Sequence, residues 1–151
     1  MRAILATIVL AVAFACVSAE SQSPAASRSP AFESARAFDH LKQLVAIGPR
    51  PAGSPGAQKT RDYIKQQLAS LGIAVTEQPF DAQTAIGTVK MVNVRGTIPG
   101  PGSGRLIIAG HYDTKLFKEF TFVGANDAGS STAFLIELAR VLKDRKNALT
   151  I

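Results

Sequence analysis

Two short clusters in the second half of the chain hold residue types that bind metal ions. His111 and Asp113 follow the apolar run 106–109, and Asp127 follows Asn126 directly ahead of a second apolar run. Residues two apart in extended backbone point to the same side of a strand. A metal-bound histidine usually donates its other ring proton to a carboxylate. Asp113 is therefore placed to orient His111 as a metal ligand.

Each cluster alone also has a simpler interpretation. His111 and Asp113 are residues that an exposed polar loop often contains, and Asp127 could cap the helix that follows it. A cap needs only one polar residue, however, whereas Asn126 and Asp127 both precede four small residues. In open α/β sheets, ligands bind at the carboxyl ends of strands. His111 stands at that end of the strand expected over 105–109.

Helical periodicity, capping residues and apolar runs predict six elements that position these clusters. In chain order they are helices over 34–47 and 55–71, strands over 73–80, 89–94 and 105–109, and a helix over 129–143. The 105–109 strand is almost wholly apolar, as a buried strand should be. The last helix leaves only Glu137 and Arg140 as a polar stripe, so we expect it to be buried on most sides. His40 is expected to face solvent, and 98–104 to form a hairpin turn.

Length and composition limit the class of protein. The chain has 151 residues and a formal net charge of +6, and this length favours one domain. Cys16 is the only cysteine, which excludes an internal disulfide scaffold. The basic residues form no stripe with interleaved aromatic residues, so no nucleic-acid partner is expected. No segment after residue 19 is apolar enough for stable membrane insertion, and nothing in the sequence specifies an oligomeric state.

The start of the chain is typical of an export signal. Arg2 precedes an uncharged apolar run over 4–16, and small residues then fit a cleavage site after Ala19. The expected organisation is a signal peptide over 1–19, a disordered spacer rich in Ser, Pro and Ala over 20–33, and one domain over 34–151. The mature protein is expected to be secreted or periplasmic, with a lipid anchor at Cys16 as the weaker alternative.

Taken together, the motifs resemble a known family. The His-x-Asp motif at 111–113, and the Gly-Ala-Asn-Asp motif at 124–127 that opens an apolar helix, resemble the zinc-dependent exopeptidases of metallopeptidase family 28, which include the glutaminyl cyclases. Residues 48–56 also look like the family's N-terminal signature, and the resemblance extends from Phe38 to the end. It implies an α/β fold, a three-layer sandwich around a mixed, mostly parallel sheet, truncated in this sequence.

The resemblance assigns roles to individual residues. In the family's aminopeptidases the residues at the positions of His111 and Asp127 bind zinc, and the one at Asp127 bridges two ions. The residue at the position of Asp113 contacts a metal ligand without binding the metal itself. Asn126 and Lys115 would line the site. In the glutaminyl cyclases one zinc is usual, Asp127 binds it and His111 need not. A lysine commonly follows the motif in that branch, as Lys115 does here.

The family's remaining ligands and its glutamate general base lie further along the chain than Ile151. The resemblance therefore implies no catalytic residue within this sequence. We expect the sequence to be the N-terminal part of a longer catalytic domain. These residues alone are expected to bind zinc poorly and to be inactive, because a catalytic zinc site needs three protein ligands.

The function implied is that of an exported hydrolase, an aminopeptidase-type metallopeptidase with one or two zinc ions that acts on the N-termini of peptides or proteins. The alternative within the family is a glutaminyl-peptide cyclotransferase, which converts an N-terminal glutamine to pyroglutamate. Outside the enzymes, the alternatives are a non-catalytic binding module or inactive fragment, and a structural secreted domain in which both clusters are only loop and cap.

Overall fold

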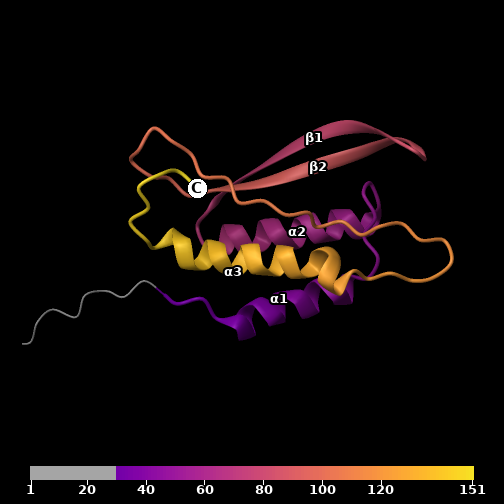
Figure 1. Ribbon diagram of the computed structural model, residues 1–151, viewed down its shortest axis with the longest axis horizontal. Coiled ribbons are helices and arrows are strands. Elements are labelled where there is room, and N and C mark those ends of the chain that lie inside the picture. The colour runs from indigo at the N-terminus through magenta and orange to yellow at the C-terminus, as the bar shows by residue number, and fades with distance from the viewer. Residues whose placement is uncertain (1–29) are drawn as a thin grey trace, which may run out of the picture.

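The computed structural model describes residues 30–151, so the signal peptide expected over 1–19 lies outside the described residues. Three helices lie together on one side of a two-stranded hairpin (Figure 1). In chain order the elements are α1 (Ser34–Ile47), α2 (Pro55–Ser70), β1 (Ala74–Thr84), β2 (Gly87–Thr97), the short irregular turn η1 (Ala125–Ser130) and α3 (Ser131–Lys143). Within residues 30–151, no helix combines the length and the apolar character needed to cross a bilayer.

Local signals explain the helices, which form close to their expected ends. The Ser54 hydroxyl accepts a hydrogen bond from the Ala57 amide at 3.1 Å, and Pro55 occupies the first position of α2. Both are typical of a helix start. Gly72 follows α2 with a φ of +73°, a conformation that favours glycine just after a helix. The chain then turns into β1.

The hairpin is longer than its apolar alternation predicts. The strands pair in antiparallel register from Ala74 opposite Thr97 to Thr84 opposite Gly87. At the tip, the Thr84 hydroxyl donates to the Gly87 carbonyl at 2.7 Å and accepts from the Ile86 amide at 3.2 Å. The backbone ladder therefore continues through polar residues up to the turn, where side-chain pattern gives no signal.

The core lies between α2, α3 and the ends of the hairpin. Its central side chains are buried and apolar: Ile64, Leu68, Ile73, Ile98 and Ile136. Leu44 of α1 is also fully buried. This burial fixes α3, and hence the turn η1 at its start, against the other two helices.

The segment 105–109 is not the buried strand that its apolar residues predict. Within residues 30–151 its only β-type pairing is one parallel bridge between Arg105 and Thr150, and the side chain of Ile107 is 83% exposed. A strand needs a neighbour along its length to pair its backbone groups, and the described chain supplies one only at Arg105. The α/β composition is confirmed, but the sheet is two-stranded and antiparallel, so the predicted mixed sandwich is not.

The buried face of α3 also differs from expectation. Glu137, expected on the polar stripe, is fully buried, whereas Phe134 is 46% exposed. The Glu137 carboxylate accepts from Arg140 at 2.6 Å and from the Glu33 amide at 2.8 Å. Arg140 also donates to the Ala31 carbonyl at 2.7 Å. Of the spacer expected over 20–33, the last three residues therefore lie ordered against α3.

Two smaller expectations are wrong because long-range contacts decide them. His40 is half-buried, and its Nδ1 lies 2.7 Å from the hydroxyl of Tyr63 on α2. Burial lowers the pKa of His40. The loop 98–104 is not a hairpin turn, because the Gly102 amide donates to the Ala148 carbonyl at 2.9 Å. The loop therefore packs against the last residues of the chain.

Candidate functional site

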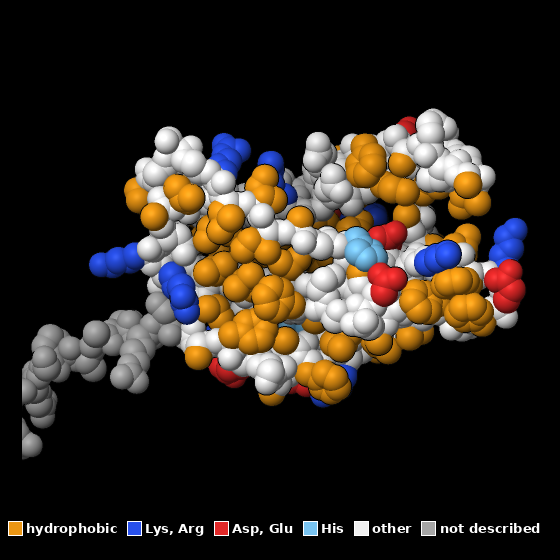
Figure 2. Space-filling view, in the orientation of Figure 1, with side chains coloured by type: hydrophobic (Ala, Val, Ile, Leu, Met, Phe, Trp, Pro, Cys, Tyr) orange, Lys and Arg blue, Asp and Glu red, His pale blue; other side chains and the backbone are white. Residues whose placement is uncertain are grey.

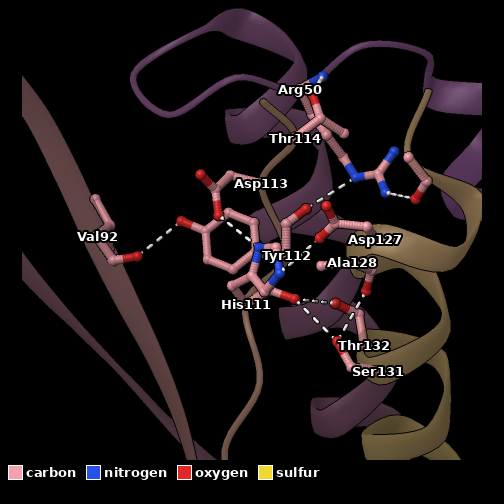
Figure 3. A network of polar contacts seen from close by, with 11 residues as sticks. Arg50, Val92, His111, Tyr112, Asp113, Thr114, Asp127, Ala128, Ser131 and Thr132 are labelled. Atoms are coloured by element: carbon pink, nitrogen blue, oxygen red, sulfur yellow. Dashed lines mark hydrogen bonds and ion pairs between the residues drawn. The ribbon is translucent and has the colours of Figure 1, made fainter. Parts of the chain in front are cut away.

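The structure brings His111 and Asp127 together from two separate loops (Figure 3). The Nε2 atom of His111 lies 2.9 Å from Oδ1 of Asp127, and its Nδ1 lies 3.2 Å from Oδ1 of Asp113. The His111 and Asp127 side chains are 59% and 63% exposed. We call these two residues the His111–Asp127 pair. An exposed imidazole nitrogen facing a carboxylate oxygen is an arrangement that can receive a metal cation.

The other two predicted site residues make their contacts elsewhere. The main-chain carbonyl of Asn126 accepts a hydrogen bond from the Ser130 hydroxyl at 2.6 Å. The Lys115 ammonium lies 4.9 Å from the centre of the Phe117 ring, a cation–π distance. Among the described residues, no hydrogen bond or ion pair joins either side chain to the His111–Asp127 pair.

The start of α3 and the hairpin hold the His111 segment from two directions. The hydroxyls of Ser131 and Thr132 donate to the His111 carbonyl at 3.2 and 3.1 Å. On the opposite side, the Tyr112 hydroxyl donates to the Val92 carbonyl of β2 at 2.7 Å. These contacts anchor the backbone on both sides of the imidazole.

Arg50 is the residue of this site to which sequence reasoning gave no role. Its side chain is fully buried, and its guanidinium donates to the main-chain carbonyls of Tyr112 at 2.8 Å, Val123 at 2.6 Å and Gly124 at 2.9 Å. Longer contacts reach the carbonyls of Leu44 and Gly48 in and after α1. Burial lowers the pKa of Arg50, and the Asp113 carboxylate opposes that shift. The signal in the sequence was an arginine flanked by two prolines in a turn-rich loop.

Thr114 and Gly124 complete the contact between the two loops. The Arg50 amide donates to the Thr114 hydroxyl at 3.0 Å, and the Thr114 amide donates to the Arg50 carbonyl at 3.2 Å. Gly124 has a φ of +52°, and a Cβ there would collide with the Asp127 carbonyl and lie 2.7 Å from Cγ2 of Thr114. Only glycine fits a position with both constraints.

A largely apolar groove of about 870 Å³ opens beside the pair. Residues of β2, the 105–113 segment and α3 line it, and His111 and Asp113 stand on its wall. In Figure 2 hydrophobic side chains cover the neighbouring surface, and a histidine with acidic side chains lies at their edge. Its lining includes the core side chains Ile64, Leu68 and Ile136, so its apolar wall is the open face of the core.

The donor set fits zinc in type but is incomplete within residues 30–151. Imidazole nitrogen and carboxylate oxygen are both zinc ligands, and a catalytic zinc takes three protein ligands. The described residues contain no group of three or more His, Cys, Asp or Glu side chains that could hold one ion. A catalytic zinc ion at the His111–Asp127 pair would therefore need at least one further ligand from outside the described residues.

Comparison with known proteins identifies the family. Residues 93–151 match the model of peptidase family M28. A glutaminyl-peptide cyclotransferase-like protein of Mus musculus is 40% identical over 107 residues, which cover 68% of this chain and 27% of that protein. These matches place residues 93–151 in peptidase family M28.

Solved structures agree with this membership. The chain resembles the crystal structure of an Acidobacteriales bacterium glutaminyl cyclase with a TM-score of 0.69 and 36% identity, over 82% of this chain and 44% of that one. A leucine aminopeptidase precursor from Bacteroides thetaiotaomicron matches with a TM-score of 0.63 and 23% identity, over 82% and 46% of the two chains. The second likeness shows the fold alone. The chain thus spans about a quarter of the mouse relative and less than half of either solved structure.

Proposed function

We propose that this chain is part of an exported zinc-dependent glutaminyl-peptide cyclotransferase, and that its His111 and Asp127 stand at the metal. The observation that carries the proposal is the difference in identity. Cyclotransferase relatives are 28–40% identical and glutaminyl cyclase structures 24–36% identical, whereas the aminopeptidase precursor is 23% identical. The M28 fold accommodates both reactions, so the sequence relationship favours the cyclase branch over the aminopeptidase expected first.

In the proposed reaction the α-amine of an N-terminal glutamine attacks its own side-chain amide carbon. A carbon–nitrogen bond closes the pyroglutamate ring, the bond to the amide nitrogen breaks, and the proton lost by the amine leaves with the departing ammonia. The chemistry that a bound zinc supplies is polarisation of the amide carbonyl. Asp127 would hold the metal with ligands from outside the described residues, and Asp113 would fix the ring orientation of His111.

The remaining steps need groups of two kinds. The proton transfer needs a general base, which the resemblance places after Ile151. The substrate's N-terminal residue also needs a site that excludes water. The reactants then lie within one molecule, so orientation rather than encounter limits the rate.

An aminopeptidase is the second candidate, and one observation favours it. The 2.9 Å separation of His111 and Asp127 places both residues at one point, as a site in which both are zinc ligands requires. In the cyclase branch the His111 position need not bind the metal. His111 therefore distinguishes the two candidates.

The test uses the protein expressed from the full open reading frame that contains this sequence. A glutamine-initiated peptide should lose one ammonia, followed by mass spectrometry, while its N-acetylated form and a leucine-coupled fluorogenic substrate should not react. Turnover of the leucine substrate alone would establish the aminopeptidase instead. Turnover of neither substrate would contradict both candidates.

Two substitutions sharpen that test. Asp127→Asn should lower zinc affinity and activity by more than about 100-fold. Loss of a residue that only hydrogen-bonds a metal ligand already costs about 10- to 100-fold, and loss of the ligand itself should cost more. His111→Gln should lower cyclase activity far less, but should lower aminopeptidase activity as much as Asp127→Asn. Asp144→Asn, at the exposed end of α3, is the matched control and should leave both unchanged.

A further inference from the structure

Arg50 joins the two loops that carry the expected metal ligands. Its carbonyl partner Tyr112 directly follows His111 in the sequence, and its partners Val123 and Gly124 precede Asp127 by four and three positions. Figure 3 shows the guanidinium between the two loops, on the side away from the strand that carries Val92. One side chain therefore fixes the backbone of both ligand-bearing segments.

The contacts of Arg50 are of a kind that sets geometry. Its guanidinium makes no ion pair within the described residues, and its hydrogen-bond partners are main-chain carbonyls in three different segments. A guanidinium presents its donors in a rigid plane, whereas an ammonium is a compact point charge. Only the planar group can reach the Tyr112 carbonyl from Nε and the Gly124 carbonyl from Nη2 at the same time. Such a buried group is costly unless its partners stay in place.

We infer that Arg50 is a positioning residue, which holds the 110–114 and 123–129 loops at the spacing that keeps Asp127 and the neighbouring His111 together at the proposed metal site. The inference rests on the proposed function in that the His111–Asp127 pair is taken as the metal site. Arg50 itself makes no hydrogen bond or ion pair with either side chain of the pair within the described residues. It would act on the metal only through the backbone.

The experiment measures metal binding and loop mobility separately from turnover. In the full-length protein, Arg50→Met keeps a long side chain but removes every donor. Zinc affinity is measured by competition with a chelator, and the site geometry by the visible spectrum of the cobalt(II) form. Hydrogen exchange of peptides covering 110–114 and 123–129 reports the loops. We expect a loss of zinc affinity of about 10- to 100-fold, as for other residues that support metal ligands, a weaker cobalt spectrum, and faster exchange in both loops.

Two further variants keep the test informative. Arg50→Lys should not restore zinc affinity, because one ammonium cannot span the carbonyls of both loops. Thr114→Val removes only the hydroxyl that accepts from the Arg50 amide, so it should fold even where Arg50→Met does not. It should change zinc affinity and loop exchange in the same direction by a smaller factor.

Glu137→Gln is the matched control. Glu137 is buried and charged like Arg50, but it bonds Arg140 and Glu33 rather than either loop. Even where Glu137→Gln lowers the melting temperature as much as Arg50→Met does, it should leave zinc affinity and loop exchange unchanged. An equal loss of zinc affinity in this control, parental affinity in Arg50→Met, or full rescue by Arg50→Lys would each overturn the inference.

The outcomes also separate this inference from the proposed function. A parent protein that binds zinc but does not cyclise glutamine would contradict the function, while the zinc affinities of the variants would still decide the role of Arg50. A parent that cyclises glutamine with an Arg50→Met variant of unchanged affinity would leave the function standing and remove Arg50 from it. A parent that binds no zinc would overturn both.

Discussion

Two segments meet at His111, and they are held in different ways. After His111, the loops joined by Arg50 have buried polar groups with several close partners. Before it, the segment 105–109 is extended, with one parallel bridge and an Ile107 side chain that is 83% exposed. The polar contacts of the loops are complete within the described chain, but the apolar contacts of the preceding segment are not.

The difference teaches which interaction places the site. Buried backbone groups must find hydrogen-bond partners, and a single arginine supplies them to two loops at once. Apolar side chains such as Leu106, 48% exposed, have no such directional requirement. The His111–Asp127 spacing therefore depends on Arg50, Thr114 and the small residues around them, and not on sheet formation at 105–109.

The largest effect is expected inside the loops. Gly124→Ala adds a side chain where φ is +52° and where the Asp127 carbonyl lies in close contact. Left-handed strain costs about 1–2 kcal/mol and overpacking about 1–3 kcal/mol, so the free energy of unfolding should fall by roughly 2–5 kcal/mol. Denaturant unfolding measures the change.

Gly72→Ala is the control for that substitution. Gly72 also has a positive φ, but a Cβ there meets nothing within 4 Å. It should cost only the strain, about 1–2 kcal/mol, and leave zinc affinity unchanged. If both substitutions lower the free energy of unfolding by the same amount, the close packing around Gly124 contributes little to stability. The loops would then not be held more firmly than the 105–109 segment.

A smaller effect is expected for Glu137→Gln, which tests a buried polar contact away from the loops. Removing the charged partner of Arg140 should cost about 1–3 kcal/mol at neutral pH. The Arg140 hydrogen bond lowers the pKa of Glu137 below its ordinary value of 4.5. A carboxyl with a lowered folded-state pKa stabilises the fold above its unfolded pKa, and loses that contribution as pH falls through the folded value.

The stability of the parent should therefore fall more steeply than that of Glu137→Gln as pH drops below about 4.5. Thermal unfolding between neutral pH and pH 3 measures both curves. Glu119→Gln, in the exposed loop between the two clusters, should follow the parent curve. Parallel parent and Glu137→Gln curves would show that the Glu137–Arg140 contact is not formed in solution.

Local residues made the helices and one half of the site predictable. Ser54, Pro55 and Gly72 mark helix ends through contacts within a few positions, and His111 and Asp113 interact because they lie two apart. The pairing of His111 with Asp127, sixteen positions later, followed from family resemblance rather than from spacing. Its geometry could be seen only in the structure.

What sequence could not show depends on distant contacts. Arg50 meets carbonyls 62 to 74 positions away, and main-chain acceptors leave no side-chain pattern to detect. Glu137 looked like a solvent-facing helix residue because its partner Glu33 contributes only a backbone amide. The apolar run 105–109 predicted burial, but burial requires a covering element that its own residues do not specify.

The smallest effect is expected at that run, and it tests the contrast most directly. Ile107→Val removes one methylene from a side chain that is 83% exposed, so in the chain described here the free energy of unfolding should change by no more than about 0.5 kcal/mol. Ile136→Val in the core removes the same group from a side chain that is 3% exposed, and should cost about 0.5–1.5 kcal/mol.

Repeating both substitutions in the protein from the full open reading frame would show whether later residues cover the segment. A cost at Ile107 that rises to the Ile136 value only in the longer protein would mean that later residues bury the 105–109 strand, whereas a core-like cost in the 151-residue chain would contradict its exposure.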